Sequence, residues 1–467
     1  MDLLLTHAYF LAEDEHEQRI MKPYPTLGLL YLKAWLDRAG FAVDLFDATF
    51  ARPHELHSRL SLRDASVLGI YVNLTTRGPA LALIARAKEV GWTVVLGGPE
   101  PANHPEKYLA AGADVIVFGE GEQTMAELLP ALSRSGAHLL HDVAGLAFCD
   151  EWGEVVTTPP RPKMRDLDAL PWPDREAIDV PAYLDCWRTA HGRSSLNLIT
   201  ARGCPYRCRW CSHAVFGYHH ARRSPEDVAA ELAHLRERWA PDMVWYADDV
   251  FTISPRWLAA YADIVDRRGL VTPFECITRA DRVDEGVAGN LARLGCDRVW
   301  LGSESGSQRV LDAMERGVTV AQIERSTRLL QARGIRVGLF VMWGYEGEQR
   351  ADIEATIEHV ARVAPDSALT TVAYPIENTP YHKAVADRVV PLAAWAEGSD
   401  RARAVRGRPK APYYAAASRR LQRRQAWQRL RRERPKAWLP AAGLALGESL
   451  DRARMRWYGA RAGGGEA

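Results

Sequence analysis

The sequence has no run of about 18 apolar residues that could cross a membrane, and it does not open with a basic segment followed by an apolar signal core. It also lacks a charge excess of either sign, because 60 Lys and Arg residues balance 59 Asp and Glu residues. The charge balance therefore favours no class of binding partner. We expect a cytoplasmic protein whose 467 residues form about two to four domains.

Cysteine is scarce, with seven residues in the chain, and three of them lie between Cys204 and Cys211. An odd number with one cluster does not match a disulfide framework and favours metal ligation in a reducing compartment. A fourth nearby ligand is missing, since neither Cys186 nor Cys276 stands at a suitable spacing. A structural zinc site normally closes with four ligands, whereas three thiolates on an iron-sulfur cubane leave one iron open.

The three clustered cysteines belong to the stretch Cys204-Pro-Tyr-Arg-Cys208-Arg-Trp210-Cys211. This CxxxCxxC spacing, with an aromatic residue before the last cysteine, resembles the signature of the radical S-adenosylmethionine (SAM) enzymes. The resemblance implies that Cys204, Cys208 and Cys211 bind a 4Fe-4S cluster whose open iron chelates SAM. One electron from such a cluster cleaves SAM to methionine and a 5′-deoxyadenosyl radical. A zinc knuckle or three unrelated buried thiols are the alternative interpretations.

Apolar runs alternate with helical patterns over residues 1–140, which predicts a parallel, doubly wound, Rossmann-like sheet. Glycine-rich turns end several of these runs, at the edge where such sheets bind ligands. The short sequence stretches that begin at Pro25, Leu96 and Gly119 resemble those of the cobalamin-binding domain that precedes the radical SAM core in one branch of that superfamily. The resemblance places cobalamin against the following residues: Asn73, Thr75, Gly97, Gly98, Gly119, Glu120 and Gly121.

One departure concerns the lower ligand of cobalt. Cobalamin domains of the methionine synthase type have the motif Asp-x-His-x-x-Gly, whereas here the run Asp14-Glu-His16-Glu-Gln-Arg19 ends in arginine. A solvated loop is the alternative interpretation of this run, and the lower axial ligand therefore stays open.

The remaining ranges are expected to form three parts. Residues 141–190 are rich in proline and predict an extended linker. Over residues 191–385, six apolar runs with intervening helices predict a partial (β/α)6 radical SAM barrel, and residues 386–467 predict a basic helical C-terminal region that ends in a disordered Gly463–Gly465. The basic stretch from Arg401 to Lys436 is compatible with nucleic-acid binding, with a solvated helix face, with a cover over the barrel mouth or with contact to an anionic membrane surface. We do not expect nucleic acid as a partner, because no RNA-binding module is visible.

Polar residues follow successive strands of the expected barrel. Asp248 and Asp249 follow the second strand, Arg279 the third and Glu304 the fourth. SAM requires a carboxylate near its amino group, a cation near its carboxylate and an acceptor for its ribose hydroxyls. The family pattern assigns Asp248 and Asp249 to the amino group and Glu304 to the ribose, with Arg279 as a looser match for the carboxylate and Trp210 beside the cluster and adenine. For each acidic residue alone, a helix cap or a solvated turn is the alternative.

The implied cofactors predict a cobalamin-dependent radical SAM enzyme that methylates an unactivated carbon of a small-molecule or natural-product substrate. Oxidative ring closure, as in the anaerobic magnesium-protoporphyrin ester cyclases, is the alternative chemistry, and a cobalamin and iron-sulfur sensor without turnover is the alternative outside enzymes. An RNA methylthiotransferase is disfavoured because no second cysteine triplet precedes the first. We expect an external electron donor of the flavodoxin or ferredoxin type. The sequence identifies no catalytic side chain beyond the cofactor ligands.

Overall fold

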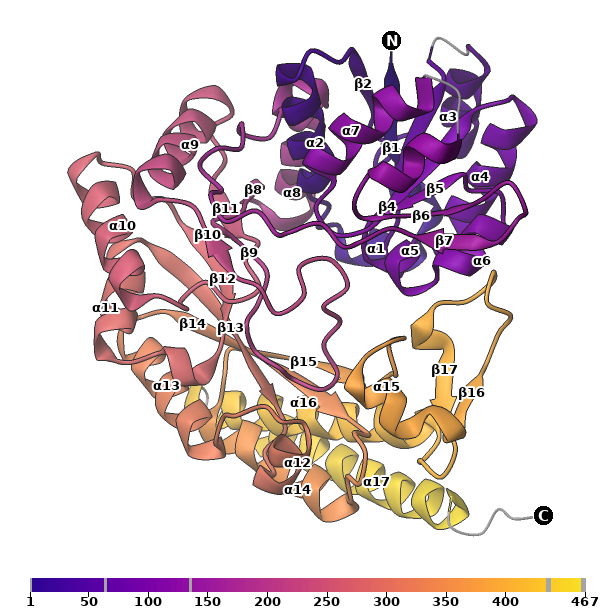
Figure 1. Ribbon diagram of the computed structural model, residues 1–467. Coiled ribbons are helices and arrows are strands. Elements are labelled where there is room, and N and C mark those ends of the chain that lie inside the picture. The colour runs from indigo at the N-terminus through magenta and orange to yellow at the C-terminus, as the bar shows by residue number, and fades with distance from the viewer. Residues whose placement is uncertain (1, 63–64, 134–136, 434–437, 463–467) are drawn as a thin grey trace. The chain divides into compact units, whose positions relative to one another are not determined.

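The computed structural model describes residues 2–62, 65–133, 137–433 and 438–462 (Figure 1). Its internal packing divides the chain into two compact units. The first unit comprises Met1–Pro205, Ser212–Asp248 and Ala393–Ser399, and the second comprises Tyr206–Cys211, Asp249–Leu392 and Asp400–Ala467. The domain boundaries expected after residues 140, 190 and 385 stay a prediction.

The first unit is built on a seven-stranded sheet in the order β2-β1-β3-β4-β5-β6-β7. Its parallel strands are β1 (Leu3–His7), β2 (Val43–Phe46), β3 (Val67–Tyr71), β4 (Thr93–Gly97) and β5 (Val115–Val117). The strand order reverses between β1 and β3, and doubly wound sheets bind ligands at such a switch point. The predicted doubly wound fold is confirmed.

Helices cover both faces of this sheet (Figure 1). Leu3 and Leu5 of β1 pack in one core with α2 and α7, whereas Leu4 packs in a second core with α3, α4 and α6. Successive side chains of a strand point to opposite faces, so the consecutive leucines serve both cores. The helices are α1 (Glu15–Ile20), α2 (Leu27–Arg38), α3 (Pro53–Ser61), α4 (Arg77–Glu89), α5 (Pro99–Asn103), α6 (Pro105–Ala110) and α7 (Gly121–Ser133).

The proline-rich range 141–190 has more regular structure than the extended linker expected from its sequence. β6 (Leu146–Cys149) and β7 (Val155–Thr157) form an antiparallel hairpin that extends the sheet beyond β5. Asp150 closes the hairpin, because its carboxylate accepts hydrogen bonds from the N–H groups of Trp152 at 3.0 Å and Glu154 at 2.9 Å. The prolines of this range all follow β7, so they do not interrupt the strand ladder.

The first unit continues through the elements that surround the cysteine loop. β8 and β11 pair in parallel, and β9 and β10 form a short antiparallel pair. These elements are α8 (Val180–His191), β8 (Ser195–Leu198), β9 (Ala201–Arg202), β10 (Ala221–Arg222), α9 (Pro225–Arg238) and β11 (Met243–Tyr246).

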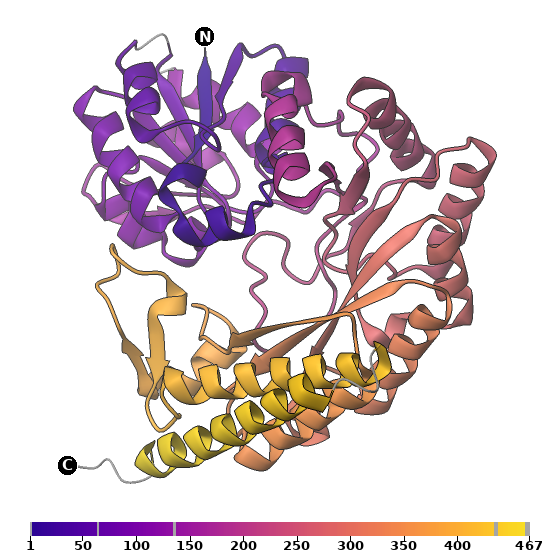
Figure 2. The ribbon, with the colours of Figure 1, turned by 180° about the vertical axis from the view of Figure 1, so that it is seen from behind.

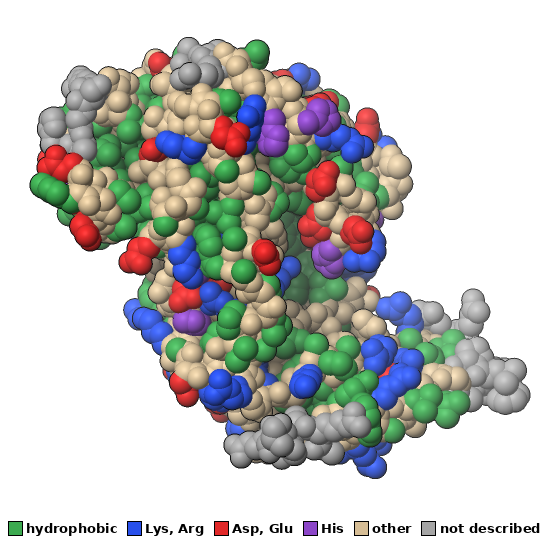
Figure 3. All heavy atoms as spheres, turned by 90° about the vertical axis from the view of Figure 1, so that its right-hand side faces the viewer, with side chains coloured by type: hydrophobic (Ala, Val, Ile, Leu, Met, Phe, Trp, Pro, Cys, Tyr) green, Lys and Arg blue, Asp and Glu red, His purple; other side chains and the backbone are tan. Residues whose placement is uncertain are grey.

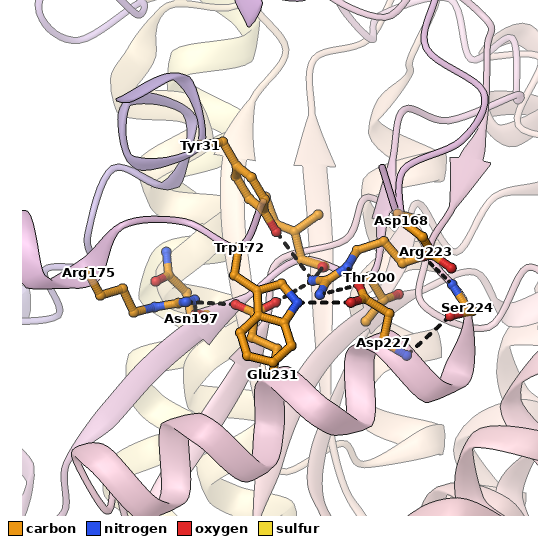
Figure 4. Close-up of polar contacts among 12 residues, drawn as sticks. Tyr31, Asp168, Trp172, Arg175, Asn197, Thr200, Arg223, Ser224, Asp227 and Glu231 are labelled. Atoms are coloured by element: carbon orange, nitrogen blue, oxygen red, sulfur yellow. Dashed lines mark hydrogen bonds and ion pairs between the residues drawn. The ribbon is translucent and has the colours of Figure 1, made fainter. Parts of the chain in front are cut away.

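A buried carboxylate, Glu231 of α9, joins two arginines of the first unit (Figure 4). Arg175 Nη1 donates to Glu231 Oε1 at 2.7 Å, and Arg223 Nη1 donates to the other carboxylate oxygen. Arg223 also bonds Asp227 at 2.6 Å and the Tyr31 hydroxyl at 3.3 Å. Although burial acts in the opposite direction, the two guanidinium groups hold the pKa of Glu231 below its ordinary value. This cluster ties α2, α9 and the proline-rich range together.

The second unit contains four parallel strands in the order β15-β14-β13-β12. Together with β8 and β11, they give the six strands with intervening helices that the sequence predicts for a partial barrel. The elements are α10 (Pro255–Arg267), β12 (Phe274–Thr278), α11 (Glu285–Arg293), β13 (Cys296–Glu304), α12 (Gln308–Ala313), α13 (Val320–Ala332), β14 (Arg336–Trp343), α14 (Arg350–Val363), β15 (Ser367–Val372), α15 (Pro380–Val385), β16 (Val389–Pro391) and β17 (Arg403–Val405).

The basic C-terminal region folds into two helices, α16 (Ala411–Glu433) and α17 (Trp438–Ala462), that run side by side (Figure 2). Buried Asp451 lies 2.8 Å from Arg423 and 3.2 Å from both Arg419 and Arg454. In Figure 3, acidic and basic side chains are interspersed on the upper part of the face drawn, whereas its lower part shows mainly Lys and Arg side chains. The ion pairs favour a packed helical hairpin over an exposed basic strip. Gly463–Gly465 lie outside the described residues.

Among the residues that the structure describes, no helix combines the length and the apolar character needed to cross a membrane.

We predict that Glu231→Gln lowers the free energy of unfolding of the first unit by about 3–5 kcal/mol, because it leaves two buried guanidinium groups without their shared charge. Urea unfolding followed by circular dichroism measures the change. Glu237→Gln, at an exposed position of the same helix, is the matched control and should cost less than about 0.5 kcal/mol. Equal losses in the two variants would contradict the prediction.

Candidate active site

The cysteine loop follows β9 and contains one buried and two partly exposed thiols. Cys208 is buried, whereas Cys204 and Cys211 are partly exposed. The N–H of Cys211 donates to the carbonyl of Cys208 at 3.2 Å, and this tight turn brings their thiols into hydrogen-bond contact. Among the described residues, no three His, Cys, Asp or Glu side chains converge on a single-ion site. Ligands of a 4Fe-4S cluster bind different irons, so they need not converge in that way.

Two arginines of the second unit reach the Cys208 thiol. Arg316 Nη1 lies 3.4 Å and Arg279 Nη1 lies 3.7 Å from its Sγ atom. The hydrogen bond from Cys211 and the charges of Arg316 and Arg279 lower the pKa of Cys208 to about 5 despite its burial. A thiolate is the form that binds iron, so this environment fits a cluster ligand. Sequence reasoning missed Arg316, which follows α12 in a segment without a recognisable motif.

Arg279 was expected to bind the SAM carboxylate. In the structure its guanidinium lies 3.8 Å from the ring centroid of Tyr206 and its Nε donates to Asp281 at 2.9 Å. Its Nη2 donates to the carbonyl of Arg316 at 2.8 Å. These contacts place Arg279 beside the cysteine loop, and its role toward SAM stays a prediction.

Glu304 lies at the end of β13, where the strand register shifts and its backbone adopts φ 57°. Its carboxylate is buried 4.0 Å from Arg316 Nε, and burial raises its pKa to about 7 although Arg316 opposes this. Among the residues that the structure describes, neither Arg316 Nε nor the buried Ser303 Oγ has a hydrogen-bond partner. Unpartnered polar atoms on the neighbouring residue Ser303 and on Arg316, which contacts Cys208, fit a bound polar ligand such as SAM. Trp210 lies in the same region, 5.7 Å from the Arg316 guanidinium; both SAM contacts stay predictions.

The two aspartates expected near the SAM amino group differ in the structure. Asp248 is buried, and its carboxylate accepts from the Thr200 and Ala201 N–H groups at 2.7 and 3.2 Å and from the Thr200 hydroxyl. Arg222 Nη2 donates to it at 3.2 Å. Asp248 therefore orders the chain just before the cysteine loop, whereas Asp249 is exposed. Their assignment to SAM stays a prediction.

The first two loops expected to contact cobalamin follow the adjacent strands β3 and β4. Asn73 Oδ1 accepts from the N–H and the hydroxyl of Thr75 at 3.0 and 2.8 Å, which forms a tight turn. Gly98 has φ 106°, and a Cβ atom there would lie 2.4 Å from the Val72 carbonyl. At Gly97, by contrast, an added Cβ would meet nothing within 4 Å. Backbone that is open on one side fits close approach by a planar ligand.

The third loop, Gly119–Gly121, follows β5. Glu120, which was expected to contact cobalamin, accepts from Arg202 Nη1 at 3.0 Å and from the Met164 N–H at 2.7 Å. Glu122 accepts from Arg202 Nη2 at 2.5 Å. Because Arg202 stands two residues before Cys204, these bonds tie the third loop to the start of the cysteine loop. The cobalamin contacts of all three loops stay predictions. His16, from the run compared with the cobalt-ligand motif, is exposed on α1.

A segment remote in sequence, Ala393–Ser399, packs beside the first two loops. The carbonyl groups of Trp395 and Gly398 accept from Arg77 Nη1 at 3.2 and 3.0 Å. Arg77 is the first residue of α4. Its Nη2 atom lies 2.5 Å from Oε1 of the buried Glu100 in α5. No local pattern marks this segment, so sequence reasoning missed it.

Comparison with known proteins identifies two domains in the chain. The model of the B12 binding domain matches residues 20–129, and the model of the radical SAM superfamily matches residues 198–360. The chain therefore belongs to the radical SAM enzymes that have an N-terminal B12-binding domain. The cofactors of this class are a 4Fe-4S cluster, SAM and cobalamin, as the sequence predicted.

Individual relatives agree with this class. An uncharacterized methyltransferase of Pyrococcus horikoshii is 29% identical and aligns over 76% of this chain and 77% of its own. The anaerobic magnesium-protoporphyrin IX monomethyl ester cyclase of Synechocystis is 26% identical over 78% of this chain and 74% of its own. TsrM of Kitasatospora setae, a radical SAM methyltransferase solved with cobalamin and a 4Fe-4S cluster, shares the fold with a TM-score of 0.69 and 21% identity over 83% of this chain and 78% of its own.

We predict that Gly98→Ala destabilises the cofactor-free protein by about 1–3 kcal/mol, because alanine is strained at this φ and would clash with Val72. Thermal unfolding measures this loss. Gly97→Ala, where an added Cβ has space, should unfold like the wild type but bind cobalamin more weakly, as judged by visible absorbance after gel filtration. Full cobalamin retention by Gly97→Ala would contradict the placement of the corrin at this loop.

The turn after β14 contains a half-buried glutamate, Glu348, whose Oε1 atom is buried. Its Oε2 atom accepts a hydrogen bond from the Gly344 N–H at 2.5 Å, while Oε1 has no hydrogen-bond partner in the described part of the chain. Burial raises the pKa of Glu348 to about 7. A group whose pKa is raised by folding contributes stability below its unfolded pKa and loses that contribution as pH rises through its folded pKa.

We therefore predict that the wild type loses more stability than Glu348→Gln when the pH rises from about 5 to about 8. The variant lacks the carboxyl that must ionise inside the protein. Urea midpoints at both pH values test this, with Glu358→Gln, at an exposed position of α14, as the control that should behave like the wild type. An equal loss of stability in the wild type and in Glu348→Gln between these two pH values would contradict the prediction.

Proposed function

We propose that this enzyme methylates an unactivated carbon of a small-molecule or natural-product substrate. The observation that supports it most is the combination of a three-cysteine loop, whose Cys208 thiol is activated by two guanidinium groups, with glycine turns at the carboxyl ends of a doubly wound sheet. The methyltransferase relative of Pyrococcus horikoshii supports the reaction class. A cobalamin and iron-sulfur sensor without turnover would need cluster thiolates as well, so formation of 5′-deoxyadenosine is the observation that separates an enzyme from a sensor.

Cys204, Cys208 and Cys211 would hold the cluster, and the backbone at Gly97 and Gly98 would face cobalamin. When bound, the cluster with SAM supplies a radical that removes hydrogen from carbon, and methylcobalamin supplies a methyl group. Arg316 and Arg279 offset the negative charge of the Cys208 thiolate. Glu304 is buried at the end of β13, where its carboxyl would accept a hydrogen bond from a ribose hydroxyl.

Oxidative ring closure is the second candidate reaction, because the cyclase of Synechocystis aligns over 78% of this chain. The expected electron donor is an external protein of the flavodoxin or ferredoxin type. We also propose a cytoplasmic location, which is supported by seven free cysteines, none of which forms a disulfide.

The first experiment is anaerobic reconstitution with iron, sulfide and cobalamin, followed by dithionite and SAM. We predict that the wild type forms 5′-deoxyadenosine and that Cys208→Ala loses this activity by at least about a hundredfold. Cys149→Ala, at an exposed thiol outside the loop, is the matched control and should keep it.

Product analysis then separates the candidate reactions. S-adenosylhomocysteine formed together with 5′-deoxyadenosine indicates methylation, whereas 5′-deoxyadenosine alone with a substrate indicates ring closure or another radical rearrangement. A wild type that binds an oxygen-sensitive cluster but cleaves no SAM would refute both.

A further inference from the structure

The arrangement of guanidinium groups around Cys208 bears on the electron transfer that must precede SAM cleavage. Arg316 is only 8% exposed, and its Nη1 is the nearer of the two donors to Cys208 Sγ, at 3.4 Å against 3.7 Å for Arg279. Hydrogen bonds to cluster sulfur ligands and nearby positive charge are two of the levers by which a protein sets the potential of an iron-sulfur cluster.

We propose that Arg316 raises the reduction potential of the cluster through its charge-assisted hydrogen bond to Cys208, and that Arg279 supports it as a second, weaker donor. This inference rests on the proposed function, since it requires that the cysteine loop hold a cluster. Arg316 acts here as a positioning and tuning residue rather than as a catalytic one.

The surroundings of Arg316 hold its guanidinium in place. Nη2 donates to the carbonyl of Gly302 at 3.2 Å, and an added Cβ at Gly302 would lie 2.3 Å from that same nitrogen. The Arg316 carbonyl in turn accepts from Arg279 Nη2 at 2.8 Å. A guanidinium that is held by Gly302, on a backbone that is held by Arg279, does not need to reorganise when the cluster gains an electron.

The backbone before Arg316 is also bonded to the cysteine loop. The N–H of Arg209, the residue after Cys208, donates to the carbonyl of Met314 at 3.1 Å. The segment that presents Arg316 therefore moves with the loop, and the distance from Arg316 to Cys208 is set by a backbone bond as well as by side chains.

Electrostatics explains why Arg316 raises the reduction potential of the cluster and does not lower it. Reduction adds one negative charge to the cluster, and a guanidinium in a buried, weakly screened environment stabilises that charge. Glu304, 4.0 Å from Arg316 Nε, opposes part of this effect when it is ionised. Without Arg316 the reduced state loses a donor while Glu304 and the thiolates remain, so reduction becomes harder.

The test is a redox titration of the reconstituted full-length protein in the absence of SAM, with the reduced cluster detected by electron paramagnetic resonance. We predict that Arg316→Gln lowers the ratio of reduced to oxidised cluster at a fixed potential by about tenfold or more, which is about 59 mV for a one-electron couple. Arg316→Lys, which keeps the charge, should recover part of the shift. Iron content and circular dichroism establish that each variant is loaded and folded.

Arg282→Gln is the matched control, because the Arg282 guanidinium lies 5.4 Å from the centroid of the same Tyr206 ring but its side chain is exposed. This substitution should leave the reduction potential unchanged. If Arg316→Gln binds no cluster, Arg279→Gln replaces it and should shift the potential in the same direction by less. Loaded variants with the wild-type potential overturn the inference alone. A wild type that binds no cluster overturns it together with the proposed function, and a shifted potential without SAM cleavage overturns only the function.

Discussion

Burying a guanidinium group is costly unless a charge or a set of hydrogen-bond acceptors accompanies it, and the first unit satisfies this requirement repeatedly. Arg175 and Arg223 share Glu231, Arg202 is held by Glu120 and Glu122, and Arg77 pairs with Glu100. Arg223 lies eight residues from Glu231, whereas the partners of Arg175, Arg202 and Arg77 lie at least 23 residues away in the sequence. The paired charges thus fix which segments meet, while the apolar cores supply most of the stabilisation.

The same requirement organises the chain on both sides of the cysteine loop. Before the loop, Asp248 collects hydrogen bonds from Thr200, Ala201 and Arg222. After Cys208, Arg209 is bonded to Met314, and Arg316 reaches the thiol from the same segment. A loop of eight residues with few apolar side chains could not hold a defined shape by its own packing, so its geometry depends on these contacts with its neighbours.

Local patterns were enough to predict much of the fold and the class of the site. The alternation of apolar runs and helices identified the doubly wound sheet, because strands and helices have different periods of burial. The hairpin β6–β7 was missed, since its short strands stand beside a proline-rich stretch that dominates the local composition. Glu120 shows what a motif does not reveal: its glycine-flanked position suggests a ligand contact, which stays a prediction, but the hydrogen bonds that its carboxylate accepts from Arg202 and Met164 have no local signature.

The sequence by itself determined the order of the two cofactor domains and predicted which cysteines would bind the cluster, because CxxxCxxC and the glycine turns are local and depend on spacing alone. Only the tertiary structure decided which side chains surround the Cys208 thiol. Arg316 lies 108 residues from Cys208, and Trp395 lies 318 residues from Arg77. Neither arginine nor tryptophan has a local signature, and the folding of the intervening chain alone brings such groups to hydrogen-bond distance.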